Sequence, residues 1–100
     1  MGKSLFQIWI HAVWTVKQRA PVLDKSFRFE LFRHIKTIAS EKGIYVDIIN
    51  GIEDHVHCLF LLKSTQTVAN VLKELKGESS RWINENNLIG GEFAWQAGYG

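Results

Sequence analysis

Two segments of this chain place apolar side chains at every second residue, and this period of two is the strongest constraint on its fold. In residues 5–16 one register is apolar throughout and contains Phe6, Ile8, Ile10, Ala12, Trp14 and Val16. In residues 55–62 one register contains Val56, Cys58, Phe60 and Leu62. Because side chains on a strand point alternately to its two faces, both segments are predicted as strands with one buried face.

Two segments with helical periodicity alternate with the predicted strands. The first has an apolar stripe of Leu31, Phe32, Ile35, Ile38 and Ala39, and Gly43 is a natural stop for it. The second has a stripe of Val68, Val71, Leu72, Leu75, Ser79, Trp82 and Ile83. Candidate N-caps are Asp24 or Ser26 for the first helix and Ser64, Thr65 or Thr67 for the second.

The remaining segments complete a βαββαβ order. Residues 44–50 are predicted as a strand in which Ile44, Val46 and Ile48 share a face, and Asn50-Gly51 predicts the turn that leads into residues 55–62. Residues 92–100 are predicted to begin a last strand. This order is typical of an α+β fold, a ferredoxin-like sandwich whose antiparallel sheet carries two helices on one face, with strands 5–16 and 55–62 as central neighbours.

Composition limits the size and setting of the protein. One hundred residues with 46% hydrophobic side chains predict a single domain spanning residues 1–100. The net charge of +2 means that nucleic-acid binding would depend on where basic groups lie. The sole cysteine, Cys58, lies in an apolar register and is expected to be a core residue in a reducing cytoplasm. Because the sequence shows neither a signal peptide nor a long apolar run, we expect a soluble protein of the cytoplasm.

The pair His55 and His57 interrupts the apolar run of its strand on one face only. Two strand residues two positions apart have Cα atoms roughly 6.6 Å apart and point the same way, so both imidazoles can bind one metal ion. The alternative is that each ring forms an ordinary hydrogen bond within the fold. In a ferredoxin-like sheet His11 would lie on the same open face as the pair, among apolar neighbours that a missing segment or a second subunit should cover.

Four segments in order resemble the IS200/IS605-type tyrosine transposases and their relatives that act on repetitive palindromic elements, all members of the HUH single-strand endonuclease superfamily. The resemblance spans nearly the whole chain. The segments are His11-Ala12-Val13-Trp14-Thr15-Val16-Lys17-Gln18-Arg19, Asp54-His55-Val56-His57-Cys58-Leu59, Lys76-Gly77-Glu78-Ser79-Ser80-Arg81 and Trp95-Gln96-Ala97-Gly98-Tyr99-Gly100.

This resemblance implies DNA transposition in a bacterial or archaeal cell, at the nucleoid when the protein is bound to DNA. It implies that His55 and His57, with a third polar side chain, bind Mg²⁺ or Mn²⁺ at a scissile phosphate. It further implies that a tyrosine cuts and rejoins single-stranded DNA through a 5′-phosphotyrosine intermediate, and that the partners are hairpin-ended single-stranded DNA and a second copy of the chain. Imidazole ligands alone favour Zn, Cu, Fe or Ni, so the choice of Mg²⁺ or Mn²⁺ comes from the resemblance.

One expected part of the family's site falls outside this sequence. The nucleophilic tyrosine of the family lies on a helix after the W-Q-x-G-Y-G segment, followed by the third metal ligand. We therefore expect both beyond Gly100, in a chain that is truncated and inactive alone. Tyr99 matches the tyrosine of the preceding strand and is the substitute nucleophile to be weighed against a packing role, and Tyr45 is a weaker candidate.

Several other polar residues are candidates for supporting roles. His11 and Asp54 are candidate hydrogen-bond partners of the metal-binding imidazoles, against the alternatives of a structural histidine and a turn carboxylate. The candidate DNA contacts are Lys17, Arg19, Lys73, Lys76, Ser80 and Arg81, against the alternative of solvated surface. A rival function is a catalytically inactive ferredoxin-like module that binds single-stranded DNA hairpins, and a two-histidine phosphoesterase ranks last because the chain has one H-x-H motif and no H-x-T/S pair.

Overall fold

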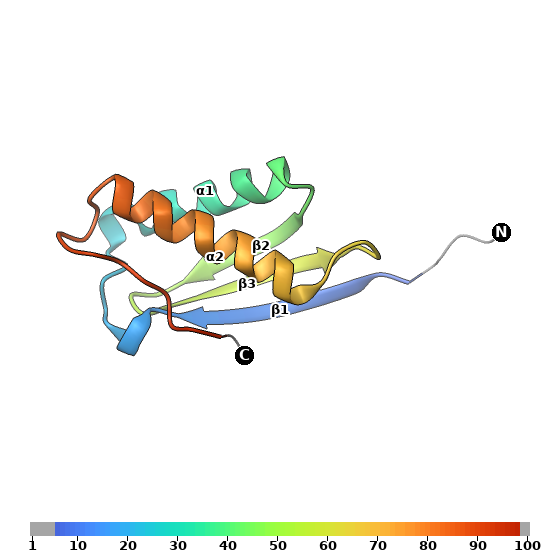
Figure 1. Ribbon diagram of the computed structural model, residues 1–100, viewed down its shortest axis with the longest axis horizontal. Coiled ribbons are helices and arrows are strands. Elements are labelled where there is room, and N and C mark those ends of the chain that lie inside the picture. The colour runs from blue at the N-terminus through green and yellow to red at the C-terminus, as the bar shows by residue number, and fades with distance from the viewer. Residues whose placement is uncertain (1–5, 99–100) are drawn as a thin grey trace.

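The computed structural model describes residues 6–98, which form one antiparallel sheet with two helices on one of its faces (Figure 1). Along the chain the elements are β1 (Ile8–Thr15), the 3-10 turn η1 (Lys17–Arg19), α1 (Lys25–Glu41), β2 (Tyr45–Gly51), β3 (His55–Leu62) and α2 (Val68–Glu85). The strand order β1-β3-β2 makes β3 the central strand, paired antiparallel with both neighbours. The predicted α+β class is confirmed, including β1 and β3 as neighbours.

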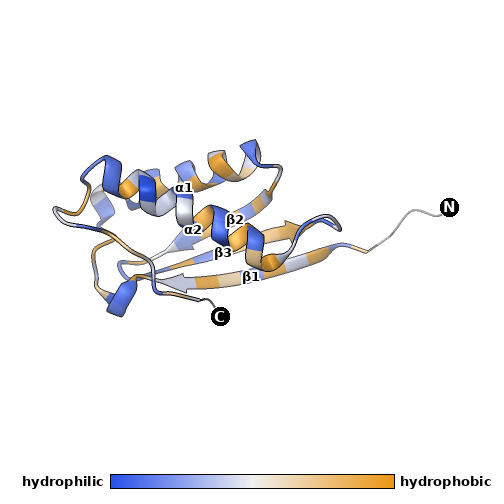
Figure 2. Ribbon diagram, in the orientation of Figure 1, coloured by the Kyte–Doolittle hydropathy of each residue, from blue (hydrophilic) through white to orange (hydrophobic). Residues whose placement is uncertain are grey.

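The core lies between the sheet and the helices and uses the predicted strand registers. Ala12 pairs with Cys58 and Trp14 pairs with Val56, and all four side chains are buried. Both helices present apolar residues to this layer and polar residues outward, so hydrophobic and hydrophilic segments alternate along each helix in Figure 2. As predicted, Cys58 is a core residue, and burial raises the pKa of its thiol to about 12.

The first part of the 5–16 register departs from the prediction. Phe6 is 88% exposed and Ile8 is 54% exposed, although both belong to the register that is buried from Ala12 onward. The reason is visible in Figure 1, where the N-terminal end of β1 extends past the helices that cover the rest of the sheet. The alternating pattern identified the strand but not how far the helices reach along it.

A β-bulge changes the face of one side chain on β2. Val46 pairs with Phe60 and Ile48 pairs with the next residue, Leu59, so Asp47 is the extra residue of the bulge. The predicted shared face of Val46 and Ile48 is therefore wrong, because one inserted residue inverts the alternation beyond it. Ile48 is 55% exposed and lies on the open face of the sheet.

The Asn50-Gly51 pair does not form the predicted turn. Both residues belong to β2, where Gly51 pairs with Val56, and residues 52–54 make the connection, closed by a hydrogen bond from Ile52 N to His55 O of 3.1 Å. A Cβ atom at Gly51 would lie 2.3 Å from His55 O. The glycine is thus required by close approach of two backbones within the ladder, and not by turn geometry.

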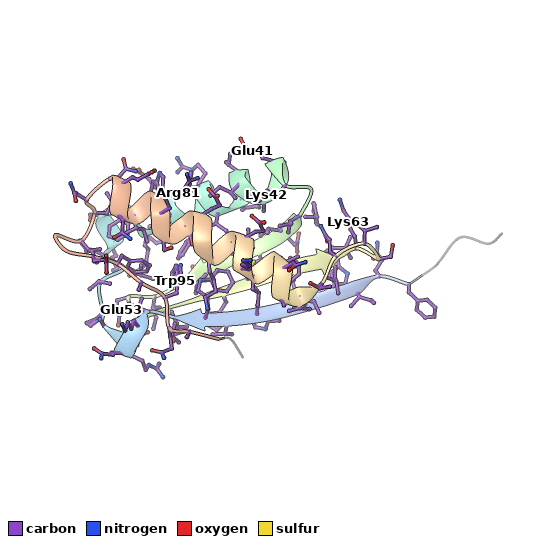
Figure 3. The ribbon with its side chains drawn as sticks, in the orientation of Figure 1. Glu41, Lys42, Glu53, Lys63, Arg81 and Trp95 are labelled. Carbon is purple, nitrogen blue, oxygen red and sulfur yellow. The ribbon has the colours of Figure 1, made fainter. Side chains whose placement is uncertain are left out.

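The helix ends agree with the sequence, whereas the last strand does not form. Asp24 caps α1 by accepting from Lys25 N, and Thr67 caps α2 by accepting from Asn70 N. Within residues 92–98 the predicted strand is reduced to one antiparallel bridge between Trp95 and Val16. The Trp95 indole, labelled in Figure 3, donates to Ser79 Oγ at 3.0 Å and so fixes this segment against α2.

Neither helix described in residues 6–98 has the length and apolarity required to cross a lipid bilayer.

Candidate functional site

The imidazoles of His55 and His57 meet at the start of β3, on the face of the sheet away from the helices. Their Nε2 atoms are 3.1 Å apart and their ring centroids 4.9 Å apart. Pairing of Thr15 with His55 and of Val13 with His57 fixes the backbone of this segment to β1. Both rings are half-buried, so the Nε2 atoms converge at the surface on a strand held from two sides.

Asp54 is the hydrogen-bond partner of His55 Nδ1. It precedes β3 and lies in the turn, where strand alternation no longer directs its side chain away from the pair. Its Oδ1 accepts from His55 Nδ1 at 2.7 Å, and its Oδ2 accepts from Arg19 Nε at 3.4 Å. The hydrogen bond from His55, assisted by Arg19, lowers the pKa of the Asp54 carboxyl. A carboxylate on Nδ1 leaves Nε2 of His55 as the nitrogen that carries the lone pair.

His11 is the hydrogen-bond partner of His57 Nδ1. It lies on β1 opposite Leu59, and its Nε2 is 3.3 Å from His57 Nδ1. The structure therefore places His11 behind His57, as a hydrogen-bond partner and not as a third ligand beside the two converging Nε2 atoms. If His57 Nδ1 donates to His11 Nε2, the lone pair of His57 also lies on Nε2.

The two Nε2 atoms lie 3.1 Å apart, within hydrogen-bond distance of each other. When each Nδ1 atom donates to its own partner, both Nε2 lone pairs face this gap, and a proton or a metal ion between them would offset their repulsion. Burial is the main effect that lowers the pKa of His57, and the neighbouring imidazoles His55 and His11 lower it further, which favours the neutral ring. A neutral imidazole is the form that binds a metal.

The spacing fits a transition-metal or Mn²⁺-type ion held by two nitrogens. Two metal–nitrogen bonds of about 2.1 Å that meet at roughly 95° span the observed separation of 3.1 Å. No group of three or more His, Cys, Asp or Glu side chains within residues 6–98 is arranged to bind a metal. Within these residues only the two nitrogens of His55 and His57 converge, so a metal ion here would need further ligands.

An apolar hollow of about 230 Å³ adjoins the pair on the open face, lined by His11, Ile48, His57 and Leu59. Ile48 reaches this hollow only because of the bulge at Asp47. Sequence reasoning placed Ile48 on the same face as Val46 and so missed its position here, and no local signal in residues 44–50 marks the bulge.

The six candidate DNA contacts fall into two groups. Lys17 and Arg19 lie on η1, and Arg19 reaches the turn before β3 through its ion pair with Asp54, the carboxylate that contacts His55. Lys73, Lys76, Ser80 and Arg81 lie on α2, on the other side of the sheet, so the structure does not bring them to the pair.

Several of the α2 candidates already have partners within the chain. Lys76 Nζ donates to the carbonyls of Gln96 and Gly98 at 2.9 and 2.5 Å, and burial lowers the pKa of its amine. Ser80 Oγ donates to Gly77 O. Arg81, which is labelled in Figure 3, forms an ion pair with Glu78. Lys73 is exposed and takes part in none of the ion pairs found among residues 6–98.

Of the two candidate tyrosines, only Tyr45 lies within the described residues. Tyr45 begins β2 opposite Leu61 and its ring contacts Trp9, with centroids 6.1 Å apart. Leu61 lies six positions beyond His55 on β3, which corresponds to about 20 Å along a strand. Tyr45 is therefore too far from the pair to act there. Tyr99 lies outside the described residues.

The fold and the site together place this protein in a class of small α+β proteins that carry an H-x-H pair on the open face of an antiparallel sheet. In this chain the Nδ1 atom of each histidine contacts a neighbouring polar side chain. The chain belongs to the IS200-like transposase family, because the family model described as "Transposase IS200 like" matches residues 4–100.

Individual relatives agree with this assignment. The chain is 32% identical over 77 residues to the ISDra2 transposase TnpA of Deinococcus radiodurans, an alignment that covers 77% of this chain and 55% of that protein. The chain thus spans about half the length of the curated relative it matches.

Two solved structures share the fold. One is a protein of Deinococcus radiodurans R1 assigned as a transposase, with a TM-score of 0.86 and 23% identity over 100% of this chain and 83% of that chain. The other is a REP-associated tyrosine transposase bound to a REP hairpin, with a TM-score of 0.64 and 15% identity over 100% of this chain and 59% of that chain.

Proposed function

We propose that this chain carries the metal-binding half of a transposase active site that cuts and rejoins single-stranded DNA. The observation that supports this most directly is the convergence of His55 Nε2 and His57 Nε2 at 3.1 Å, with Asp54 and His11 on the opposite nitrogens. Two ring nitrogens that converge on one point of the open face suit the binding of a single ion.

The proposed cofactor is Mg²⁺ or Mn²⁺, bound by His55 and His57. Imidazole alone does not select these ions, so oxygen ligands must supply the rest of the coordination, from the DNA phosphate and a third side chain outside residues 6–98. When bound, the ion would neutralise charge on the non-bridging phosphate oxygens. The described residues contribute the fixed direction of the two ring nitrogens and a site open enough to admit a phosphodiester.

The proposed reaction is a transesterification that conserves the phosphodiester energy. A tyrosine hydroxyl gives up its proton and its oxygen forms a bond to phosphorus, while the bond to the 3′-oxygen breaks and that oxygen takes a proton. The products are a 5′-phosphotyrosine and a free 3′-hydroxyl, and reversal on another end rejoins the strand. In this proposal the tyrosine comes from outside residues 6–98, because Tyr45 is too distant.

The proposed partner is single-stranded DNA with hairpin ends, by analogy with the relative that is bound to a REP hairpin. Lys17 and Arg19 lie on the turn after β1, where Arg19 pairs with Asp54 next to His55, and both suit contact with the DNA backbone near the cut. The α2 group, on the opposite side of the sheet, suits a separate stretch of the same DNA. We further propose a homodimer, because Trp9, Tyr45 and Ile48 expose apolar surface on one face of the sheet.

The test is cleavage of a hairpin-flanked single strand with Mn²⁺. A chain extended through a tyrosine-bearing helix is expected to cut and remain covalently joined to the 5′ end, whereas residues 1–100 alone are expected to bind without cutting. In the extended chain His57→Ala should abolish cleavage and retain most DNA affinity, because phosphate contacts elsewhere dominate binding. Unchanged cleavage by His57→Ala would refute the metal role, and covalent capture by residues 1–100 would assign the nucleophile to Tyr99.

The rival function is a hairpin-binding module without catalysis. It is favoured by the lack of a tyrosine near the histidine pair within residues 6–98. Hairpin binding by the extended chain with no cleavage under any divalent ion would support this rival.

A further inference from the structure

The turn after β1 holds two consecutive residues in a conformation that their side chains disfavour. Gln18 has φ 58° and ψ 20°, and Arg19 has φ 55°. Left-handed backbone is uncommon for residues other than glycine, asparagine and aspartate, and it persists only where surrounding contacts impose it. Something in the structure must therefore hold this turn.

Gln96 provides those contacts from the other end of the chain. Its side-chain Oε1 accepts from Gln18 N at 3.1 Å, and its backbone N donates to Thr15 O at 2.8 Å. Its carbonyl accepts from Lys76 Nζ at 2.9 Å. One residue thus connects the end of β1, the left-handed turn and α2, and the last segment of the chain runs beside the end of β1 in Figure 1.

The same turn determines where Arg19 lies, and Arg19 leads to the histidine pair. Arg19 Nε donates to Asp54 Oδ2 at 3.4 Å, and Asp54 Oδ1 accepts from His55 Nδ1 at 2.7 Å. A further hydrogen bond of 2.8 Å, from Val16 N to Asp54 O, joins the backbone of the turn to Asp54. A change in the turn would therefore change the support of the carboxylate that orients His55.

We infer that Gln96 is a positioning residue for His55, acting through the left-handed turn, Arg19 and Asp54. The inference rests on the proposed function, since it treats His55 Nε2 as a metal ligand. It adds a role for a residue about 40 positions away in sequence that touches neither the histidines nor their direct partners.

The test compares two near-isosteric variants of the 100-residue chain. Gln96→Met keeps the length of the side chain but removes the acceptor for Gln18 N, whereas Gln96→Glu keeps an oxygen acceptor. Free Mn²⁺ is measured by electron paramagnetic resonance during titration. We expect Gln96→Met to weaken Mn²⁺ binding on the order of fivefold, and Gln96→Glu to stay within about twofold of the wild type.

A second substitution separates positioning from general loss of structure. Asparagine accepts left-handed backbone more readily than glutamine, so Gln18→Asn should make the turn less dependent on Gln96. In the Gln96→Met background, Gln18→Asn is expected to restore most of the Mn²⁺ affinity. Equal affinity of wild type and Gln96→Met, or no recovery in the double variant, would overturn the inference.

A measurement without metal keeps this inference distinguishable from the proposed function. Long-range proton–nitrogen spectra of the imidazoles report which nitrogen of His55 is protonated, and the contact with Asp54 predicts Nδ1 in the wild type. We expect Gln96→Met to give a mixture of both tautomers. If the wild type binds no Mn²⁺, the proposed function fails, and the tautomer of His55 in Gln96→Met still decides whether Gln96 positions the ring.

Discussion

At the scale of single residues, function depends on which nitrogen of each ring is left free. Asp54 and His11 lie against the Nδ1 atoms of His55 and His57, so the Nε2 atoms, 3.1 Å apart, are the nitrogens directed at a common point. Asp54 does so with a charged acceptor, which fixes the tautomer and the orientation of the His55 ring. The contact of His11 with His57 Nδ1 is longer, at 3.3 Å against 2.7 Å for Asp54 with His55 Nδ1, so we expect Asp54 to be the more important of the two supports.

Asp54→Asn is the corresponding prediction. The variant keeps an oxygen near His55 Nδ1 but loses the charge, so Mn²⁺ binding should weaken by about tenfold. Titration calorimetry of the wild type and the variant measures this directly. Glu53→Gln is the matched control, because Glu53 is the preceding turn residue and contributes its backbone carbonyl to Leu23 N. Equal losses in the two variants would mean that only the net charge of the turn matters.

The sequence was sufficient to bring the three histidines together, but not to assign roles to them. Strand alternation placed His55 and His57 on one face, and the antiparallel order placed His11 beside them, as the structure shows. The direction of each ring depends on χ angles and on Asp54, whose side chain leaves the strand pattern because β3 begins one residue later. Contacts such as Gln96 with Gln18 join residues 78 positions apart, and no local pattern encodes them.

At the scale of elements, two glycines with opposite surroundings show how the sheet and α2 differ. Gly51 lies where a Cβ atom would meet His55 O at 2.3 Å and Val56 Cα at 3.0 Å. Both obstacles are backbone atoms of the strand that carries the histidines, so neither can move without disturbing the pairing. Gly77 lies in α2 with nothing within 4 Å of its Cβ position among the residues that the structure describes.

Substitution of these glycines by alanine should therefore have opposite effects. Gly51→Ala is expected to lower the free energy of unfolding by about 2–4 kcal/mol, the range of changes that force strain on a packed backbone. Gly77→Ala is expected to raise it by about 0.5–1 kcal/mol, because alanine is the better helix former. Urea denaturation measures both. If Gly77→Ala instead lowers the affinity for a hairpin, the open space at Gly77 serves a bound partner.

Packing between α1 and α2 predicts a dependence of stability on pH. His34 of α1 stacks on Trp82 of α2, with ring centroids 4.7 Å apart and planes inclined by 23°. Burial lowers the pKa of His34, against the opposing influence of Glu41 and Glu78, while Arg81 lowers it further. The folded protein thus prefers the neutral ring, whereas the unfolded chain keeps the ordinary histidine pKa of about 6.5.

The sign of this effect follows from proton linkage. A lowered folded-state pKa gives stability that is complete above the unfolded value and is lost as the pH falls through the folded value. His34→Phe keeps an aromatic ring on Trp82 without a titrating group. The free energy of unfolding of wild type relative to His34→Phe should therefore decrease between about pH 8 and about pH 5, measured by urea denaturation. A constant difference across this range would show that protonation of His34 is not opposed by the fold.

At the scale of the whole molecule, the two faces of the sheet are unequal. One face is covered by α1 and α2, and Val56, Cys58 and Phe60 of β3 are fully buried on it. The other face carries the histidine pair and also Trp9, Tyr45 and Ile48, which are 42%, 52% and 55% exposed. The alternation in the sequence predicted apolar side chains on the uncovered face, and the bulge on β2 adds Ile48 to them.

Exposed apolar surface of this kind favours association, so the 100-residue chain is expected to sediment as a dimer at concentrations of about 100 μM. Trp9→Lys places a charge on the open face far from His55 and should shift the protein to a monomer with little change in its unfolding temperature, because the residue is already partly solvated. Phe29→Lys is the matched control, since Phe29 is 55% exposed on α1, outside the sheet. Sedimentation velocity distinguishes the outcomes. A monomeric wild type would show that two copies do not associate through this face, and dissociation by Phe29→Lys would place the interface on the helices.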